Sequence, residues 1–211
     1  MPRPPAQPKR SDFTGEELEA YDRVLARFGA AGEDKEVHPY FGALLNGPEM
    51  AATLSKMGTL IRGAPNRGNT YSHHDREIVD QVLSYDFGYY GVLPLHTPDA
   101  VACGVRLEAI EAIRDGREED LTDEERLLVT YVREVVGGGV TDETYEAIEC
   151  RVGKRGAAEY TMFIAYLSTV IRLFQAFGMP SPTKEEIDTL IDGLRDGSVP
   201  VPSYEEAAVR L

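Results

Sequence analysis

The sequence has few of the residues and motifs that mark common enzyme classes. It contains no tryptophan and only two cysteines, Cys103 and Cys150, which are too far apart in sequence to suggest a disulfide framework or a metal site. It also lacks a glycine-rich phosphate loop, a Cys-x-x-Cys pair, a Gly-x-Ser-x-Gly elbow and a His-Glu-x-x-His pair. These absences leave few side chains that are able to do chemistry.

Basic residues and long hydrophobic runs are scarce as well. The 211 residues hold 22 Lys and Arg against 36 Asp and Glu, and this net charge of -14 argues against a nucleic-acid surface. An anionic substrate would need a local arginine cluster to offset this charge. The most apolar run, residues 160–177, is interrupted by polar side chains, and residues 1–10 are proline-rich and polar. We therefore expect a cytoplasmic protein with neither a nucleic-acid nor a membrane partner.

Helical periodicity is what the sequence does contain. Three segments read as capping boxes followed by apolar residues at helical spacing, namely Thr14–Glu17, Thr122–Glu125 and Thr183–Glu186. Nothing alternates as a strand would, so the pattern predicts an all-α bundle of seven or eight helices. We expect one domain over residues 13–196, a flexible N-terminal arm over 1–12 and a C-terminal extension over 197–211. The apolar face predicted for residues 156–177 exceeds what a monomer needs, which predicts a homo-oligomer, dimer or trimer.

One pair of residues stands out as a candidate for chemistry. Glu77 lies near the start of an apolar helical segment that opens at Ser72, and His96 follows nineteen residues later. A carboxylate and an imidazole can form a proton relay. Because Pro94 and Pro98 bracket His96, two geometries compete. Either one helix runs from about residue 89 to 103 with a kink at His96, or a helix starts at residue 97 and His96 lies just before its positive end.

The order of motifs over roughly residues 38–178 resembles that of carboxymuconolactone decarboxylase-like proteins. The segment 38–50 reads His-Pro-Tyr-Phe-Gly-Ala-Leu-Leu-Asn-Gly-Pro-Glu-Met, and 75–79 reads Asp-Arg-Glu-Ile-Val. His96, Ala100 and Gly104 then match a His-x-x-x-Ala-x-x-x-Gly-Val pattern. The resemblance implies an all-α oligomer with sites near subunit contacts, and it places Glu77 and His96 at the family's relay positions. It also favours a histidine within a helix.

Two features of this superfamily are missing from the chain. The alkyl hydroperoxidase D-like branch has cysteines seven and four positions before the histidine, where this chain has Tyr89 and Val92. A thiol-disulfide reductase cannot work without those thiols, so we do not expect peroxide reduction. The decarboxylase branch has Tyr-Glu-Trp at the fifth to third positions before the histidine, which here are Gly91, Val92 and Leu93. One acid of the decarboxylase site is therefore absent.

The resemblance implies a cofactor-independent lyase or isomerase that moves a proton on a small carboxylated carbonyl or lactone compound. His96 would take or return the proton, and Glu77 would orient the imidazole. Tyr89 and Tyr90 would donate to an oxyanion, and Arg76 or Arg106 would hold a substrate carboxylate; this list completes the predicted site. No metal and no cofactor are expected.

Each of these assignments has a structural alternative. In the structural alternative, Glu77 is only a helix-start acid and His96 a structural histidine. The two tyrosines are core residues and the two arginines are salt-bridge partners. His73 and His74 suggest a metal at first sight, but adjacent helical residues diverge by about 100°. The alternative function is a family member without catalysis, which binds a small molecule or acts as an oligomeric scaffold.

Overall fold

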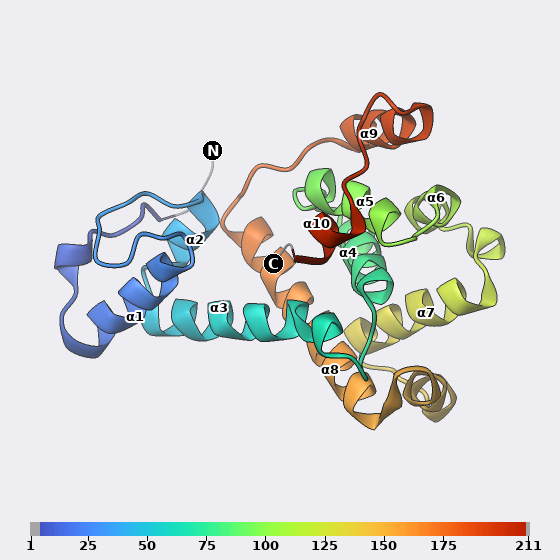
Figure 1. Ribbon diagram of the computed structural model, residues 1–211, viewed down its shortest axis with the longest axis horizontal. Coiled ribbons are helices and arrows are strands. Elements are labelled where there is room, and N and C mark those ends of the chain that lie inside the picture. Colours follow the sequence, from blue (N-terminus) through green and yellow to red (C-terminus); the bar gives the residue numbers. More distant parts are fainter. Residues whose placement is uncertain (1–4, 210–211) are drawn as a thin grey trace. The chain divides into compact units, whose positions relative to one another are not determined.

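The computed structural model describes residues 5–209 as helices joined by turns (Figure 1). Within these residues there are ten α-helices, three short 3-10 helices and no strand, which confirms the all-α prediction. The predicted number of helices was too low. The prediction missed the short helices α2 (Pro39–Leu44) and α10 (Tyr204–Val209), whose six residues are too few for a helical periodicity to stand out.

The chain forms two compact units. The first consists of residues up to Leu60 together with Arg172–Pro180, and the second of Ile61–Ile171 together with the residues from Ser181 onward. The first unit holds the 3-10 helix Arg10–Asp12, α1 (Gly15–Ala26), α2 and most of α3 (Pro48–Arg62). Its core is apolar and packs Tyr21, Val24 and Leu25 with Leu45 and Ala51. In the segment predicted to be a flexible arm, the Gln7 side chain donates to the Tyr21 hydroxyl at 3.1 Å.

The second unit is built around α4 (His73–Phe87). The remaining elements of this unit are α5 (Leu93–Ala102), α6 (Leu107–Asp115), α7 (Asp123–Gly137), most of α8 (Asp142–Ala176), α9 (Lys184–Asp196) and α10, with 3-10 turns at Ala64–Arg67 and Glu118–Asp120. Helix α4 packs against α5, α6 and α7, and Figure 1 shows these three beside it. Every residue of α4 from Asp75 to Ser84 is buried, so α4 is the central helix of this unit.

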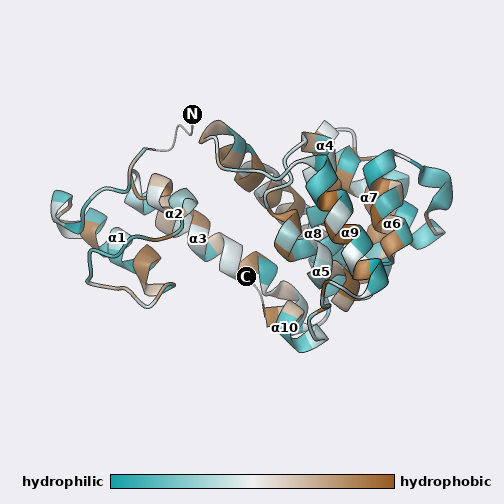
Figure 2. Ribbon diagram, turned by 90° about the horizontal axis from the view of Figure 1, so that it is seen from above, coloured by the Kyte–Doolittle hydropathy of each residue, from teal (hydrophilic) through white to brown (hydrophobic). Residues whose placement is uncertain are grey.

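The helices around α4 are amphipathic. Helices α6 and α7 each bury one apolar side, formed by Ile110 and Ile113 in α6 and by Leu128 and Val132 in α7. Figure 2 shows hydrophilic and hydrophobic segments alternating along both ribbons. None of the helices within residues 5–209 combines the length and apolar character that a membrane span requires.

Some of the helix starts and ends predicted from the sequence are confirmed and others are wrong. Thr122 and Thr183 accept hydrogen bonds from the backbone amides of Glu125 and Glu186, so these two capping boxes form as predicted. Helix α1 begins after Thr14, but the Thr14 side chain makes no cap hydrogen bond, and that predicted box was wrong. The two helices predicted around residues 141–148 and 156–177 form one element, α8, that breaks at Gly153, whose φ of 75° and ψ of 166° are not helical.

Candidate functional site

Helix α4 carries two acids on one face. Its first turn is fixed by a reciprocal capping box, in which Ser72 accepts from the Asp75 amide and Asp75 accepts from the Ser72 amide. Glu77 and Asp80 follow three residues apart, a spacing that places side chains on the same side of a helix. Both carboxylates are completely buried, at 0% exposure. Buried carboxylates need charged or hydrogen-bonding partners, because desolvation of an unpaired charge is costly.

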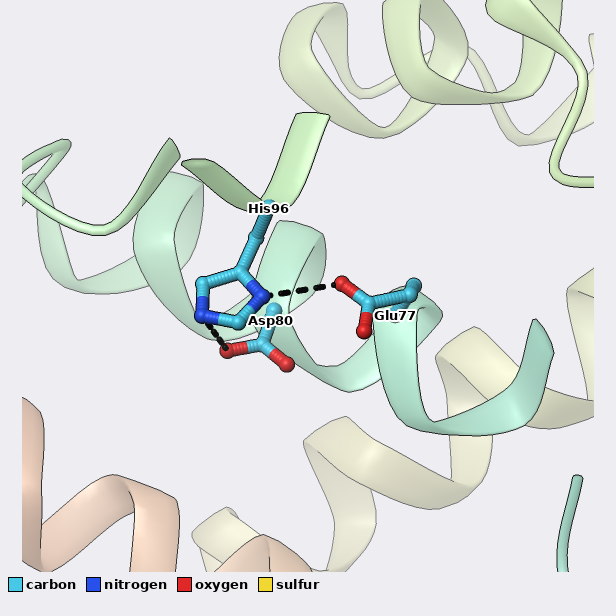
Figure 3. A group of neighbouring side chains, drawn as sticks. All are labelled: Glu77, Asp80 and His96. Atoms are coloured by element: carbon cyan, nitrogen blue, oxygen red, sulfur yellow. Dashed lines mark hydrogen bonds and ion pairs between the residues drawn. The ribbon is translucent and has the colours of Figure 1, made fainter. Parts of the chain in front are cut away.

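His96 reaches these acids from the first turn of α5. That helix begins at Leu93, has Pro94 in its first turn and includes Pro98 in its interior. The helix starts after residue 89 and before residue 97, so the start is corrected in both geometries considered from the sequence, while the expectation of a histidine within the helix is confirmed. Proline is tolerated early in a helix, where its missing N–H would have no partner, which explains the start next to Pro94. His96 lies within the helix, and its ring points towards α4 (Figure 3).

The imidazole lies between the two carboxylates. His96 Nδ1 is 3.0 Å from Glu77 Oε2, and His96 Nε2 is 3.9 Å from Asp80 Oδ1 (Figure 3). The first distance is a hydrogen bond and the second is a longer charge contact. The structure thus brings together the two residues that sequence analysis paired, and it adds Asp80.

Arg62, from the end of α3, completes this side of the cluster. Its Nη1 and Nη2 donate to the two Asp80 oxygens at 3.3 and 3.1 Å, a two-pronged ion pair. Its Nη2 also lies 3.1 Å from His96 Nδ1 and 3.2 Å from His96 Nε2. The guanidinium is therefore close to the ring as well as to the acid, and its Nε has no hydrogen-bond partner among the described residues.

Arg76 holds the other side of Glu77. Its Nε donates to Glu77 Oε1 at 2.8 Å, and Nη2 donates to the Ala207 carbonyl at 2.9 Å. Nη1 donates to the Arg62 carbonyl at 3.4 Å. Because Arg76 is 0% exposed and engaged in this way, it orients Glu77 and is not placed as a clamp for an incoming carboxylate. Its interaction with Ala207 gives the C-terminal helix α10 a part in supporting the site.

The charges of the cluster balance when the imidazole is neutral. Glu77 and Asp80 carry two negative charges, and Arg62 and Arg76 carry two positive ones. Burial works to raise the pKa of Glu77, but His96, Arg62 and Arg76 outweigh burial and hold that pKa well below its usual value. Burial likewise opposes the charge of Arg62, but Asp80 and Glu77 raise the Arg62 pKa, so both groups stay ionised.

The Glu77 contact selects one tautomer of the imidazole. An ionised carboxylate only accepts hydrogen bonds, so the proton of a neutral His96 ring belongs on Nδ1, which faces Glu77 Oε2. Nε2 then keeps its lone pair, and Arg62 Nη2 lies 3.2 Å from Nε2 and 3.1 Å from Nδ1. The arrangement produces a basic nitrogen that is oriented by a carboxylate and lies beside a guanidinium.

The same three side chains could also offer ligands to a metal ion. One atom each from Glu77, Asp80 and His96 lie within 4.8 Å of one another. However, Arg62 donates to both Asp80 oxygens and lies against both ring nitrogens, so it holds the positive charge that a cation would bring. A metal would have to displace this guanidinium, and the donor set therefore fits a cation poorly while Arg62 is in place.

Three further predicted site residues lie in the connections around α5 and α6. Tyr89 and Tyr90 belong to the turn between α4 and α5, where Tyr89 is buried and burial raises its pKa to about 12. The Tyr90 amide donates to Ser181 Oγ at 2.9 Å. Arg106 precedes α6 and pairs with Glu125 at 2.6 Å, with a side chain 41% exposed. Its hydrogen bonds go to Glu125 and to the Asp120 carbonyl.

Arg62 and Asp80 were not among the residues predicted from the sequence. Asp80 had a usable signal, since it lies one helical turn after Glu77 in a segment otherwise made of buried residues. Arg62 had none, because it lies on another helix and reaches the site only through the fold. Comparisons of the chain with known protein families, with characterised proteins and with solved structures gave no match.

Proposed function

We propose that the protein is a cofactor-independent acid/base enzyme of the decarboxylase or isomerase type, acting on a small carboxylated carbonyl or lactone compound. The observation that carries the proposal is the 3.0 Å hydrogen bond between two buried groups, Glu77 Oε2 and His96 Nδ1. The resemblance to carboxymuconolactone decarboxylase-like proteins supports the same assignment, because it places these two residues at the relay positions. The missing decarboxylase acid, at Val92, leaves the choice between the two reaction types open.

His96 would act as the base through Nε2. In an isomerisation, this nitrogen takes a proton from the carbon next to a carbonyl, the electron pair moves onto the carbonyl oxygen, and the imidazolium returns the proton to another carbon. In a decarboxylation, His96 Nε2 first takes a proton from solvent. The bond to the carboxylate then breaks, carbon dioxide leaves while the electron pair moves onto the carbonyl oxygen, and the imidazolium gives its proton to the carbon. Glu77 stabilises the imidazolium in both cases without moving.

Arg62 takes the role that sequence analysis gave to Arg76 or Arg106. It is the guanidinium nearest to the basic nitrogen, at 3.2 Å from His96 Nε2. An anionic substrate would draw it from Asp80, since guanidinium groups bind carboxylates in a two-pronged manner. The same movement would expose the lone pair of Nε2. Substrate binding and activation of the base are thereby linked in this proposal.

One observation favours the alternative, a member that binds or scaffolds without catalysis. Both ring nitrogens of His96 already have partners inside the protein, Glu77 at 3.0 Å and Arg62 at 3.2 Å. A permanently closed cluster of this kind would stabilise the second unit and do no chemistry. The two functions differ in whether the histidine responds to ligands and to solvent protons.

The test is proton exchange on a small probe. Pyruvate and a carboxylated butyrolactone are incubated with the full chain in deuterium oxide, and deuterium entry at the carbon next to the carbonyl is followed by NMR. We expect the wild type and His74→Gln to catalyse exchange, and His96→Gln to lose at least 100-fold, the lower range for general base catalysis. Exchange that is equal in His96→Gln and His74→Gln would contradict the proposal.

A second measurement covers variants that fail to fold. Ring nitrogen shifts of His96, assigned with His96→Gln, should report a proton on Nδ1 in the wild type and a changed tautomer balance in Glu77→Gln. Glu125→Gln is the matched control, since it weakens a carboxylate–arginine pair of 2.6 Å that contains no histidine. A His96 ring that is indifferent to Glu77 and to the probes supports the scaffold function.

A further inference from the structure

Helices α1 and α3 of the first unit line a cavity that has no part in the proposed reaction. Its volume is about 620 Å³, a size typical of small-molecule sites. Three cations line it: Arg23 and Arg27 from α1 and the residue that follows it, and Lys56 from α3. None of the described residues that line it is an aspartate or a glutamate. Such a concentration of positive charge is unexpected in a chain with 36 acidic and 22 basic residues.

Arg27 is fixed in place before any ligand arrives. Its Nη1 donates to Ser55 Oγ at 2.7 Å and to the Ser55 carbonyl at 3.3 Å. Its guanidinium carbon lies 5.6 Å from the centre of the Phe41 ring, within the range of a cation–π contact. Neither partner is an anion, so the positive charge of Arg27 is oriented but not neutralised.

The other two cations are weakly compensated. Within residues 5–209, Arg23 forms an ion pair with one acid, Glu19, at 3.9 Å one helical turn earlier, and the Arg23 side chain is 61% exposed. No carboxylate among residues 5–209 forms an ion pair with Lys56. An exposed pair of this length contributes little, so Arg23 and Lys56 remain available to an external anion.

The hydroxyl groups of two threonines that line the cavity already donate to backbone carbonyls and are not available to a ligand as donors. Thr53 donates its hydroxyl proton to the Glu49 carbonyl at 2.9 Å, and Thr59 donates to the Ser55 carbonyl at 3.2 Å. The charged donors at the cavity are the three cations. The C-terminal end of α1 opposes an anion with roughly half a negative charge, which three full positive charges exceed.

We propose that this cavity binds a small ligand through a phosphate group. A phosphate monoester carries close to two negative charges at neutral pH and offers three terminal oxygens, which suits three cationic donors better than the two oxygens of one carboxylate. The volume leaves room for an organic body beside the phosphate, against Ala52 and Leu60. The proposal is independent of the reaction at His96.

The test is a titration of the full chain with inorganic phosphate and with acetate at constant ionic strength, followed by amide NMR shifts of α1 and α3. The variants are Arg23→Gln, Lys56→Gln and their combination. Arg155→Gln, which removes an equally exposed positive charge at 65% exposure on α8, is the matched control. We expect phosphate to bind at millimolar concentration and more tightly than acetate. Each single variant should weaken binding at least fivefold and the double variant should abolish it.

Three results would overturn the proposal. The first is the absence of saturable phosphate shifts at α1 and α3 in a folded wild type. The second is an equal loss in Lys56→Gln and Arg155→Gln, which would show that net charge alone attracts the anion. The third is acetate binding as tight as phosphate binding, which would show that the site takes carboxylates and that the assignment of a phosphate group is wrong.

Discussion

Two groups of arginines in this chain lie in opposite electrostatic surroundings. In the second unit, Arg62 and Arg76 are buried and each is paired with a buried acid, at 3.1 Å to Asp80 and 2.8 Å to Glu77. In the first unit, Arg23 and Arg27 face a cavity whose described lining holds no acid. The protein compensates its own charges in one place and leaves them for solvent or a ligand in the other.

The difference follows from the cost of desolvation. An ion buried away from water loses several kcal/mol of hydration, so Arg62 and Arg76 persist only with their carboxylates beside them. Exposed cations keep their hydration and need no partner. The buried group is thus tied to the integrity of the fold, whereas the exposed group can change without affecting it. Each of the following predictions tests one side of this contrast.

The largest effect is expected at the Arg62–Asp80 pair. Arg62→Met and Asp80→Asn should each lower the free energy of unfolding by about 3–5 kcal/mol, because each leaves one buried charge unpaired. The double variant should lose less than the sum of the two, since it removes both charges. Denaturant unfolding of all four proteins gives the coupling energy.

The matched control for this cycle is a surface pair. Arg126 and Asp123 are 3.0 Å apart, with side chains 41% and 102% exposed. Their cycle should show a far smaller coupling. If the two coupling energies are equal, the buried pair contributes no more to stability than an exposed pair, and the contrast between the two groups of arginines fails.

Parts of this site could be predicted from the sequence and parts could not. The Ser72–Asp75 box and the apolar residues after it locate the start of α4, and so place Glu77 in its early turns, because these signals act within a few residues. His96 was found by the chemistry of its side chain and by its position in a resembling family. Arg62 lies 34 residues from His96 and 18 from Asp80, and no local pattern joins them. The start of α5 was misplaced because two prolines gave competing boundaries, and the helix begins between the two predicted positions, at Leu93.

The pH dependence of stability should reveal the ionised Glu77. Its pKa is held below the usual 4.5 in the folded protein, so the folded state resists protonation more than the unfolded state. The stability that this contributes is complete above about pH 4.5 and is lost as the pH falls through the lowered value. The difference in unfolding free energy between wild type and Glu77→Gln should shrink over that range, at up to ~1.4 kcal/mol per pH unit.

The effect of salt on the pH dependence of stability should distinguish the buried Glu77 from a more exposed acid. Hydrogen bonding to Arg114 lowers the pKa of Asp115 to about 2, but its side chain is 29% exposed. The pH-dependent difference for Asp115→Asn should therefore diminish in 1 M sodium chloride, while that for Glu77→Gln should persist. Equal sensitivity to salt would mean that water reaches Glu77 freely.

The smallest effect on stability is expected at the cavity of the first unit. Arg23→Gln and Lys56→Gln should change the free energy of unfolding by no more than about 0.5 kcal/mol in the absence of phosphate, since neither charge is buried. With phosphate at ten times its dissociation constant, the wild type should gain ~1.4 kcal/mol and the double variant should gain nothing. Thermal unfolding with and without phosphate measures both quantities on the same samples. A loss above 1 kcal/mol without phosphate would show that these cations hold the first unit together, and the two groups of arginines would then serve the same structural purpose.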